Sequence, residues 1–298
     1  MITTEAPAKV NLSLRVAAVD RSGFHRLQSR VQMVDWHDYL AIEWWEEDLL
    51  EIIGLPTPPE GSVDLPTGKD NLVWKSAAAF WVGDPGKRRP VRVALEKHIP
   101  VAAGLAGGSA DAAAMAVGLA ALTGRPVDFA RLIEVGSDIA FSLSGGSALM
   151  EGYGEALSPV PMPDDFTLVL AVPPIELSTP AVYQRWDDLD GPAGVPLPGR
   201  SVPPSLRDLE VMNDLYPAAV SIVPDLADYR SQLMAAWGRP VAMSGSGPTL
   251  FAFFADLEEA TGAASVVSGM RAIRATIPVD HGARVRPQER DYNDPVRH

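Results

Sequence analysis

The sequence predicts an α+β fold of about two domains, and three observations lead to this prediction. The chain has 298 residues, which corresponds to about two domains of ordinary size. Hydrophobic residues make up 47% of it and charged residues 21%, a composition typical of a globular protein with a buried core. Strand-like and helix-like segments alternate without the regular order of strand–helix–strand units, which disfavours a doubly wound parallel sheet.

Strands are predicted where apolar and polar side chains alternate, or where short β-branched and aromatic runs end in turn residues. In chain order these segments are 9–16, 27–43, 91–95, 145–155 (interrupted by a glycine turn), 166–172 and an apolar run that begins at Val241. Residues 20–23 predict the turn between the first two strands. The Pro- and Gly-rich residues 54–70 and 191–204 predict long loops.

Helices are predicted from apolar spacing combined with residues that begin or end a helix. They cover residues 71–81, an alanine-rich run that ends at Gly124, residues 128–135 and residues 256–270. Candidate N-caps are Asn71, Asp128 and Asp256, and the last of these forms a capping box with Glu259.

A change in composition near residue 159 predicts a domain boundary. Prolines occupy positions 159, 161 and 163, between two strand-like segments. We therefore expect an N-terminal domain of residues 1–158 and a C-terminal domain of residues 159–298. The last residues, 286–298, are highly charged and are expected to be disordered.

Charge and cysteine content limit the partners and the compartment. With 25 basic and 38 acidic residues the net charge is −13, so neither nucleic acid nor an anionic membrane is an expected partner. A small anionic ligand stays compatible, because a pocket can be locally positive. The chain has no cysteine, which excludes disulfides, thiol nucleophiles and zinc–thiolate sites. It shows no signal-peptide pattern and no apolar run of about 18 residues, so we expect a cytoplasmic protein.

A glycine-rich loop that leads into a helix carries the clearest chemical signal. Gly104, Gly107 and Gly108 precede the alanine-rich helix, whose first N–H groups and dipole favour an anion such as phosphate. Ser109 could add a hydroxyl to a phosphate oxygen or to its magnesium ion. The loop has neither the lysine of a Walker A motif nor the G-x-G-x-x-G of a dinucleotide site. Taken alone, it is also compatible with a tight turn packed against a strand.

Other candidate residues are ambiguous when each is taken alone. MSGSGPT at 243–249 is either a second loop over a ligand or a constrained entry to a strand. Asp138 in Gly136-Ser137-Asp138 is either a functional carboxylate or an N-cap. Lys9 and His25 would more commonly be solvated side chains.

Together these segments resemble a known family. P-x-x-x-G-L-x-G-G-S-A-D-A-A from Pro100, the early APAKVNL and the late MSGSGPT resemble the GHMP small-molecule kinases. APAKVNL combined with GFHRLQS at 23–29 is most similar to the branch that acts on a cytidine-diphosphate-linked methylerythritol in the non-mevalonate isoprenoid route. Further agreement comes from GSD at 136–138, GYGE at 152–155 and STPAVY at 178–183.

The resemblance implies a two-domain GHMP kinase fold with the active site in the interdomain cleft. It implies ATP and Mg²⁺ as cofactors and a small-molecule substrate, in a monomer or a homodimer. Asp138 would be the base that takes the proton of the substrate's 2-hydroxyl, and the Lys9 ammonium would keep that carboxylate ionised and steady the transferring group. The residues that would ligate Mg²⁺ are not identified.

The resemblance also assigns residues to the two ligands. The ATP phosphates would be bound by Pro100, Ala103, Gly104, Leu105, Ala106, Gly107, Gly108, Ser109 and Ala110. The substrate would be bound by Asn11, Phe24, His25, Thr179, Tyr183, Gly245, Ser246 and Gly247. Within this second group, His25 would hydrogen-bond the cytosine edge, while Phe24 and Tyr183 would stack on its two faces.

Some positions depart from the usual pattern of these kinases. Phe24 replaces a common Tyr, Ala106 a frequent Gly, Ala140 a common Pro and Tyr153 a common Arg. These departures concern substrate affinity more than reaction type. Two alternatives stay open: a GHMP kinase for another small alcohol such as homoserine or mevalonate, and a non-catalytic ligand-binding relative.

Overall fold

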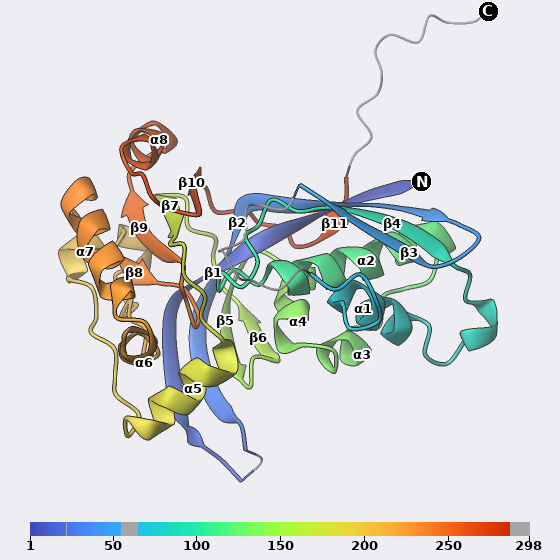
Figure 1. Cartoon of the computed structure of the whole chain (residues 1–298), viewed down its shortest axis with the longest axis horizontal. Helices are drawn as coiled ribbons and strands as arrows, with labels where there is room; N and C mark the ends of the chain where they lie inside the picture. Colours follow the sequence, from blue (N-terminus) through green and yellow to red (C-terminus); the bar gives the residue numbers. More distant parts are fainter. Residues whose placement is uncertain (22, 55–64, 287–298) are drawn as a thin grey trace, which may run out of the picture.

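Two β-sheets with helices packed against them form the molecule, as described by a computed structural model for residues 1–21, 23–54 and 65–286 (Figure 1). The larger sheet has the strand order β11-β1-β2-β4-β3, and β5 pairs with β2 and β6. Its strands are β1 (Ile2–Val19), β2 (His25–Trp44), β3 (Leu49–Ile53), β4 (Val91–Glu96), β5 (Ser147–Gly152), β6 (Ala156–Pro159) and β11 (Arg284–Val285).

The smaller sheet has the order β10-β7-β9-β8. Its strands are β7 (Thr167–Val172), β8 (Ala242–Met243), β9 (Leu250–Phe254) and β10 (Ala272–Thr276). Within the described residues β3 and β4 form a parallel pair, and the other paired strands are antiparallel. The predicted α+β class is therefore confirmed.

The helices divide between the two sheets. Figure 1 shows α1 to α4 beneath the larger sheet and α5 to α8 around the smaller one. Their bounds are α1 (Leu72–Phe80), α2 (Gly107–Thr123), α3 (Phe129–Ile133), α4 (Ser137–Ser144), α5 (Thr179–Asp188), α6 (Tyr216–Ile222), α7 (Asp225–Trp237) and α8 (Leu257–Ser265). None of the helices in the described residues is both long and apolar enough to span a bilayer.

The structure matches the first residues of the predicted helices more often than their last residues. Asn71 accepts a hydrogen bond from Val73 N at 2.9 Å and so caps α1. Gly124 ends α2 in the left-handed conformation at φ 72°. Asp256 accepts from Glu259 N at 2.8 Å, but α8 ends at Ser265 and not at Met270. Two β-branched valines and Gly269, at φ 77°, follow and stop the helix early.

Several elements were not predicted: β3, β6, β10, β11, α4, α5, α6 and α7. The 191–204 loop contains a short 3-10 turn at Gly199–Ser201. Three predictions lie partly outside the described residues: the 20–23 turn at residue 22, the 54–70 loop at residues 55–64, and the expected disorder of 286–298 at residues 287–298.

β1 connects the two halves of the molecule and positions the site. Its even-numbered residues are buried in successive cores: Ala6 packs in the cluster around α2, whereas Val10 and Leu12 pack with the smaller sheet. Because side chains alternate along a strand, Lys9 and Asn11 point to the opposite side. Both are nonetheless buried, so their polar groups must be satisfied by neighbouring residues.

α2 packs very closely against the larger sheet. Nine of its residues are buried, and the small side chains of its alanine-rich sequence allow this close packing. A Cβ on Gly118 would lie 2.3 Å from the Cδ1 of Ile42, so any larger residue here would force that side chain to move. This packing fixes the N-terminus of α2, and with it the glycine-rich loop.

Candidate active site

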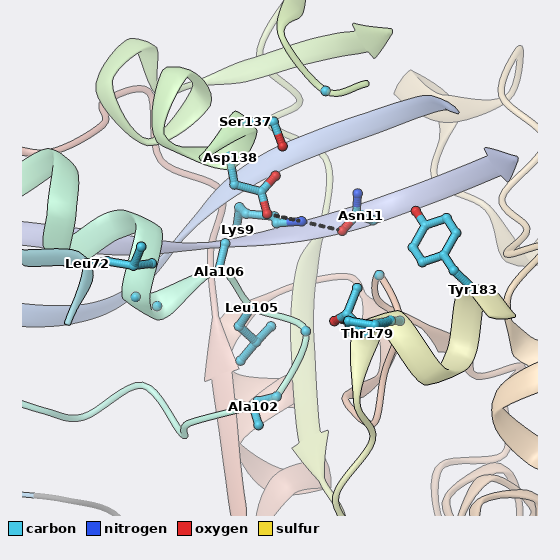
Figure 2. A pocket seen from close by; sticks show the side chains of 18 of the residues that line it. Lys9, Asn11, Leu72, Ala102, Leu105, Ala106, Ser137, Asp138, Thr179 and Tyr183 are labelled. Atoms are coloured by element: carbon cyan, nitrogen blue, oxygen red, sulfur yellow. Dashed lines mark hydrogen bonds and ion pairs between the residues drawn. The ribbon is translucent and has the colours of Figure 1, made fainter. Parts of the chain in front are cut away.

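A cavity of about 1300 Å³ lies where the two sheets and their helices meet. Residues from β1, β2, the glycine-rich loop, α4 and α5 line it, together with Gly245 and Ser246 of the second glycine loop. Figure 2 shows Lys9, Asn11, Asp138, Thr179 and Tyr183 arranged around it. Segments that are far apart in the sequence thus contribute to one site.

Lys9 and Asp138 meet at the centre of this cavity. Lys9 Nζ lies 3.3 Å from Asp138 Oδ2 and donates to Asn11 Oδ1 at 2.7 Å (Figure 2). Asn11 is in turn fixed, because its Nδ2 donates to Ser29 Oγ at 2.7 Å. The Lys9 side chain is 8% exposed and that of Asp138 31%, so the carboxylate is accessible to a ligand whereas the ammonium is held in place behind it.

Local structure explains where Asp138 lies. Gly136 is the N-cap of α4 and Asp138 belongs to the first turn of that helix, not to the cap itself. A carboxylate in the first turn is stabilised by the helix dipole. Asp138 also influences Tyr183: burial, together with the negative charge of Asp138, raises the pKa of Tyr183 to about 12. The tyrosine therefore remains a neutral phenol beside this carboxylate.

The glycine-rich loop lies against β1 and the second glycine loop. Lys9 N donates to Leu105 O at 3.1 Å, which joins the loop to the strand that carries the lysine. Gly104 has φ 76°, and a Cβ there would lie 2.7 Å from Ser244 O. Only glycine satisfies both conditions. The loop then enters α2 with Ala106 as N-cap, in the left-handed conformation at φ 55°.

We predict that Ala106→Gly stabilises the protein by about 0.5–1 kcal/mol. An alanine in the left-handed region costs roughly 1–2 kcal/mol, and part of the gain is offset by the greater freedom of glycine in the unfolded chain. Urea denaturation of both proteins measures the difference. Ala120→Gly, in the body of α2, is the control and should destabilise by about 1 kcal/mol. A lower stability of Ala106→Gly would contradict the prediction.

The second glycine loop is fixed by side chains that the sequence analysis did not identify. Ser244 Oγ accepts from Asn11 N at 3.1 Å and donates to Gly104 O at 3.1 Å. Thr249 donates to Ala103 O through both its backbone N–H and its hydroxyl. Asn213 Nδ2 donates to Met243 O and to Gly245 O, each at 2.8 Å. These contacts join the two loops into one rigid floor for the cavity.

Aromatic and acidic side chains around His25 line another part of the cavity. His25 Nε2 is 2.8 Å from Asp187 Oδ1, and the His25 ring contacts Tyr183 at a centroid distance of 5.1 Å. Phe24 is 66% exposed, and its ring contacts Tyr153 edge-to-face at 6.1 Å. Asp187 and Tyr153 were absent from the predicted site residues, although Tyr153 had been noted as a departure from the family pattern.

A buried charged cluster lies beneath the first turn of α2. Lys97 donates to Asp38 and, at 2.7 Å, to Asp111 Oδ2. Asp38 Oδ1 also accepts from His98 N at 2.6 Å and from Ile99 N at 2.8 Å. Lys97 and Asp111 line the cavity, so the cluster supports both the loop and the site above it.

Burial and mutual charge act in opposite directions on this cluster. Burial raises the pKa of Asp111 to about 8, with the Lys97 charge opposing the shift and the Asp38 charge adding to it. Burial alone would lower the pKa of Lys97, but the charges of Asp111 and Asp38 outweigh it and raise that pKa. The ammonium therefore stays protonated beneath the glycine-rich loop, and the Asp38 carboxylate to which it is bonded offsets its charge.

Most of the predicted site residues line the cavity, and three do not. Those that line it are Lys9, Asn11, Phe24, His25, Pro100, Ala103, Gly104, Leu105, Ala106, Gly107, Gly108, Asp138, Thr179, Tyr183, Gly245 and Ser246. Ser109, Ala110 and Gly247 are not among the lining residues. Ala110 is buried in the core around α2. A Cβ added to Gly247 would point toward Met243 and Leu177. Thr179 Oγ1 lies 2.8 Å from Ser246 Oγ, which connects α5 to the second glycine loop.

Two family descriptions match the chain. Residues 71–151 match the GHMP kinases N terminal domain, and residues 204–270 match the GHMP kinases C terminal domain. The first match contains the glycine-rich loop and Asp138. The second contains the MSGSGPT segment.

Curated relatives match over most of the chain. It is 40% identical over 270 residues to the 4-diphosphocytidyl-2-C-methyl-D-erythritol kinase of Cereibacter sphaeroides, which covers 88% of this chain and 92% of that protein. It is 34% identical to the enzyme of the same name from Geobacter metallireducens, with coverages of 90% and 94%.

Solved structures give the same fold. A crystal structure of 4-(cytidine 5'-diphospho)-2C-methyl-D-erythritol kinase has a TM-score of 0.75 at 32% identity and covers 92% of this chain and 98% of that one. The homoserine kinase from Cytophaga hutchinsonii has a TM-score of 0.66 at 18% identity, with coverages of 95% and 96%, a likeness of fold alone.

Proposed function

Because this chain belongs to the GHMP kinases, and within them to the 4-diphosphocytidyl-2-C-methyl-D-erythritol kinase family, we propose that it phosphorylates the 2-hydroxyl of 4-diphosphocytidyl-2-C-methyl-D-erythritol with ATP. The observation that carries this proposal is the Lys9–Asp138 pair, 3.3 Å apart, in a cavity that also contains the glycine-rich loop. A phosphate site and an accessible carboxylate thus face the same space.

In the proposed reaction the substrate hydroxyl oxygen attacks the γ-phosphorus. The new O–P bond forms as the bond between the γ-phosphorus and the β,γ-bridging oxygen breaks, and ADP leaves with the bridging oxygen. Asp138 accepts the hydroxyl proton. Phosphoryl transfer depends mainly on positioning and charge neutralisation, which Lys9 and the N-terminus of α2 supply. Asn11 fixes the Lys9 ammonium in the position that this role needs.

The glycine-rich loop fits the ATP phosphates. Gly107 and Gly108 line the cavity at the start of α2, where backbone N–H groups lack partners within the helix. A Cβ on Gly107 would lie 3.3 Å from Lys97 Nζ, so an ammonium lies next to this turn. We propose that ATP places its phosphates here.

Magnesium has no assembled set of protein ligands among the described residues. Asp138 is paired with Lys9, Asp111 is bonded to Lys97, and Ser109 does not line the cavity. We therefore propose that Mg²⁺ enters with the nucleotide, whose phosphates and water supply most of its ligands.

We propose that the aromatic side chains around His25 receive the cytidine. Phe24 and Tyr183 both line the cavity, and the exposed Phe24 ring is available for stacking. His25 Nε2 is engaged by Asp187, so a cytosine edge would have to meet Nδ1 or the backbone of His25. Thr179 on α5 contacts Ser246 of the second glycine loop, so both side chains are also close enough to this helix to meet the substrate.

The direct experiment is an assay of the purified protein with the cytidine substrate, ATP and Mg²⁺. ADP release that depends on the cytidine substrate, together with a phosphorylated product, would support the proposal. Homoserine and mevalonate serve as competing acceptors. ADP release with either of these, and none with the cytidine substrate, would overturn the assignment of substrate while leaving the kinase reaction in place.

We predict that Phe24→Ala raises KM for the cytidine substrate about tenfold, with a smaller effect on kcat. Stacking of a base on an aromatic ring contributes about 1–3 kcal/mol, and no contact joins the Phe24 ring to Lys9 or Asp138 among the described residues. Tyr183→Ala should act in the same direction. Steady-state kinetics measure both. Phe129→Ala on α3, which also removes an exposed aromatic ring, is the control and should leave KM unchanged. An unchanged KM in Phe24→Ala would remove Phe24 from the substrate site.

The domain division and compartment follow as further proposals. A boundary near residues 158 and 159 is supported by the strands of the smaller sheet, which all begin after residue 166.

A reducing cytoplasm suits a chain without cysteine.

A further inference from the structure

Two histidines and a glutamate come together outside the cavity, where the segment between β10 and β11 crosses β1 and β2. Glu5 lies on β1, His37 on β2 and His281 on the crossing segment. One potential ligand atom of each side chain lies within 4.8 Å of the other two. None of the three residues lines the active-site cavity. Figure 1 shows the crossing segment passing from the smaller sheet to β11 in the larger one.

Nearby oxygen atoms indicate which nitrogen of each ring carries the proton. His37 Nδ1 lies 3.1 Å from Asp35 Oδ1, and His281 Nδ1 lies 3.0 Å from Gly282 O. A carboxylate and a carbonyl oxygen can only accept, so each Nδ1 carries the proton. Each Nε2 is therefore left with a lone pair. Orientation of a histidine through its other nitrogen is typical of metal ligands.

The atoms that converge are all acceptors. His281 Nε2 lies 3.9 Å from Glu5 Oε1, and neither atom has a proton to share. His37 is 92% buried, since 8% of its surface is exposed, yet its Nε2 has no hydrogen-bond partner among the described residues. A buried polar atom without a partner costs about 1–3 kcal/mol. A cation would satisfy all three side chains at once.

The ligand atoms of the three side chains define the class of cation. Imidazole nitrogen and carboxylate oxygen suit Zn²⁺ and similar transition metals, whereas Mg²⁺ and Ca²⁺ prefer oxygen alone. Arg284 Nε now donates to Glu5 Oε1 at 2.5 Å, and Arg284 is half exposed, so it can turn toward solvent. Tetrahedral zinc needs donors about 3.4 Å apart, so ligand atoms that now lie up to 4.8 Å apart must approach by up to about 1.4 Å.

We propose that Glu5, His37 and His281 form a binding site for Zn²⁺ or a related transition metal, with a fourth position open to water. The metal would join the crossing segment to β1 and β2. That segment is already held by backbone bonds, from Asp35 N to Ile277 O at 3.0 Å and from Val279 N to Met33 O at 2.9 Å. A metal there would stabilise the contact between the C-terminal segment and the larger sheet, independently of the kinase reaction.

Calorimetric titration of tag-free, chelator-treated protein with Zn²⁺ tests the site. We expect one Zn²⁺ per chain and a rise in Tm, because binding to the native state alone stabilises it. His281→Ala and His37→Ala should each weaken binding at least tenfold. His98→Ala, which removes an exposed histidine bonded to Glu96, is the matched control and should bind as the wild type does.

His281→Ala keeps the test valid if the buried His37→Ala variant does not fold, because His281 lies on a connecting segment. Circular dichroism establishes the fold of each variant. The proposal is overturned if the wild type binds no Zn²⁺, if His281→Ala binds it with wild-type affinity, or if Mg²⁺ binds equally well.

Discussion

Asp138→Asn is expected to lower kcat by about 10²–10⁴-fold, the usual contribution of a general base. The amide keeps the shape of the side chain but cannot accept the hydroxyl proton, and it leaves Lys9 without its countercharge at 3.3 Å. ATP binding should persist, because the phosphates are assigned to the glycine-rich loop. Steady-state ADP release and a separate nucleotide-binding titration measure the two effects.

Asp225→Asn is the control for this change, since Asp225 is exposed at the start of α7 and does not line the cavity. It should keep wild-type kcat. A kcat for Asp138→Asn close to that of this control would show that another group accepts the proton. Loss of nucleotide binding together with kcat would instead place Asp138 in the ATP site.

Local patterns predicted the parts of the fold that depend on neighbouring residues. The glycine-rich loop, the start of α2 and the caps at Asn71 and Gly124 all follow from short-range chemistry. Alternation along residues 9–16 predicted a strand, and this strand is the central part of β1. It did not predict that Lys9 and Asn11 are buried, because the residues that cover them come from elsewhere in the chain.

Contacts between distant segments could not be predicted from such patterns. The meeting of Lys9 with Asp138 depends on how β1, the loop and α4 pack, and only the family resemblance suggested it. The same holds for Asp187 beside His25, which requires α5 to lie against the end of β2.

Some missed features did leave a signal in the sequence. On β4, Val91, Val93 and Leu95 point inward, so the same period of two places Lys97 at a buried position. A lysine there predicts a buried ion pair, which the structure contains. In α7, Leu226, Leu233 and Trp237 have helical spacing and Gly238 ends the helix at φ 62°, so this helix was also predictable.

The buried position of Lys97 leads to the second large expected effect: Lys97→Met should destabilise the protein by about 3–5 kcal/mol, the usual cost of removing one partner of a buried pair. The Lys97 side chain is 2% exposed and that of Asp38 is fully buried, so the variant leaves the Asp38 carboxylate without its countercharge. Urea denaturation measures the loss. Lys75→Met, at an exposed position of α1, should change stability by no more than about 0.5 kcal/mol.

A double variant separates lost charge from lost packing. In Lys97→Met with Asp38→Asn, the Asp38 charge is gone, while the amide oxygen can still accept from His98 N and Ile99 N. The second partner, Asp111, can stay protonated, because burial raises its pKa to about 8. Replacing a buried ion pair by a neutral pair is often close to neutral in stability. We therefore expect the double variant to be more stable than Lys97→Met alone. If both variants are equally unstable, the lysine acts through its packing beneath α2 and not through its charge.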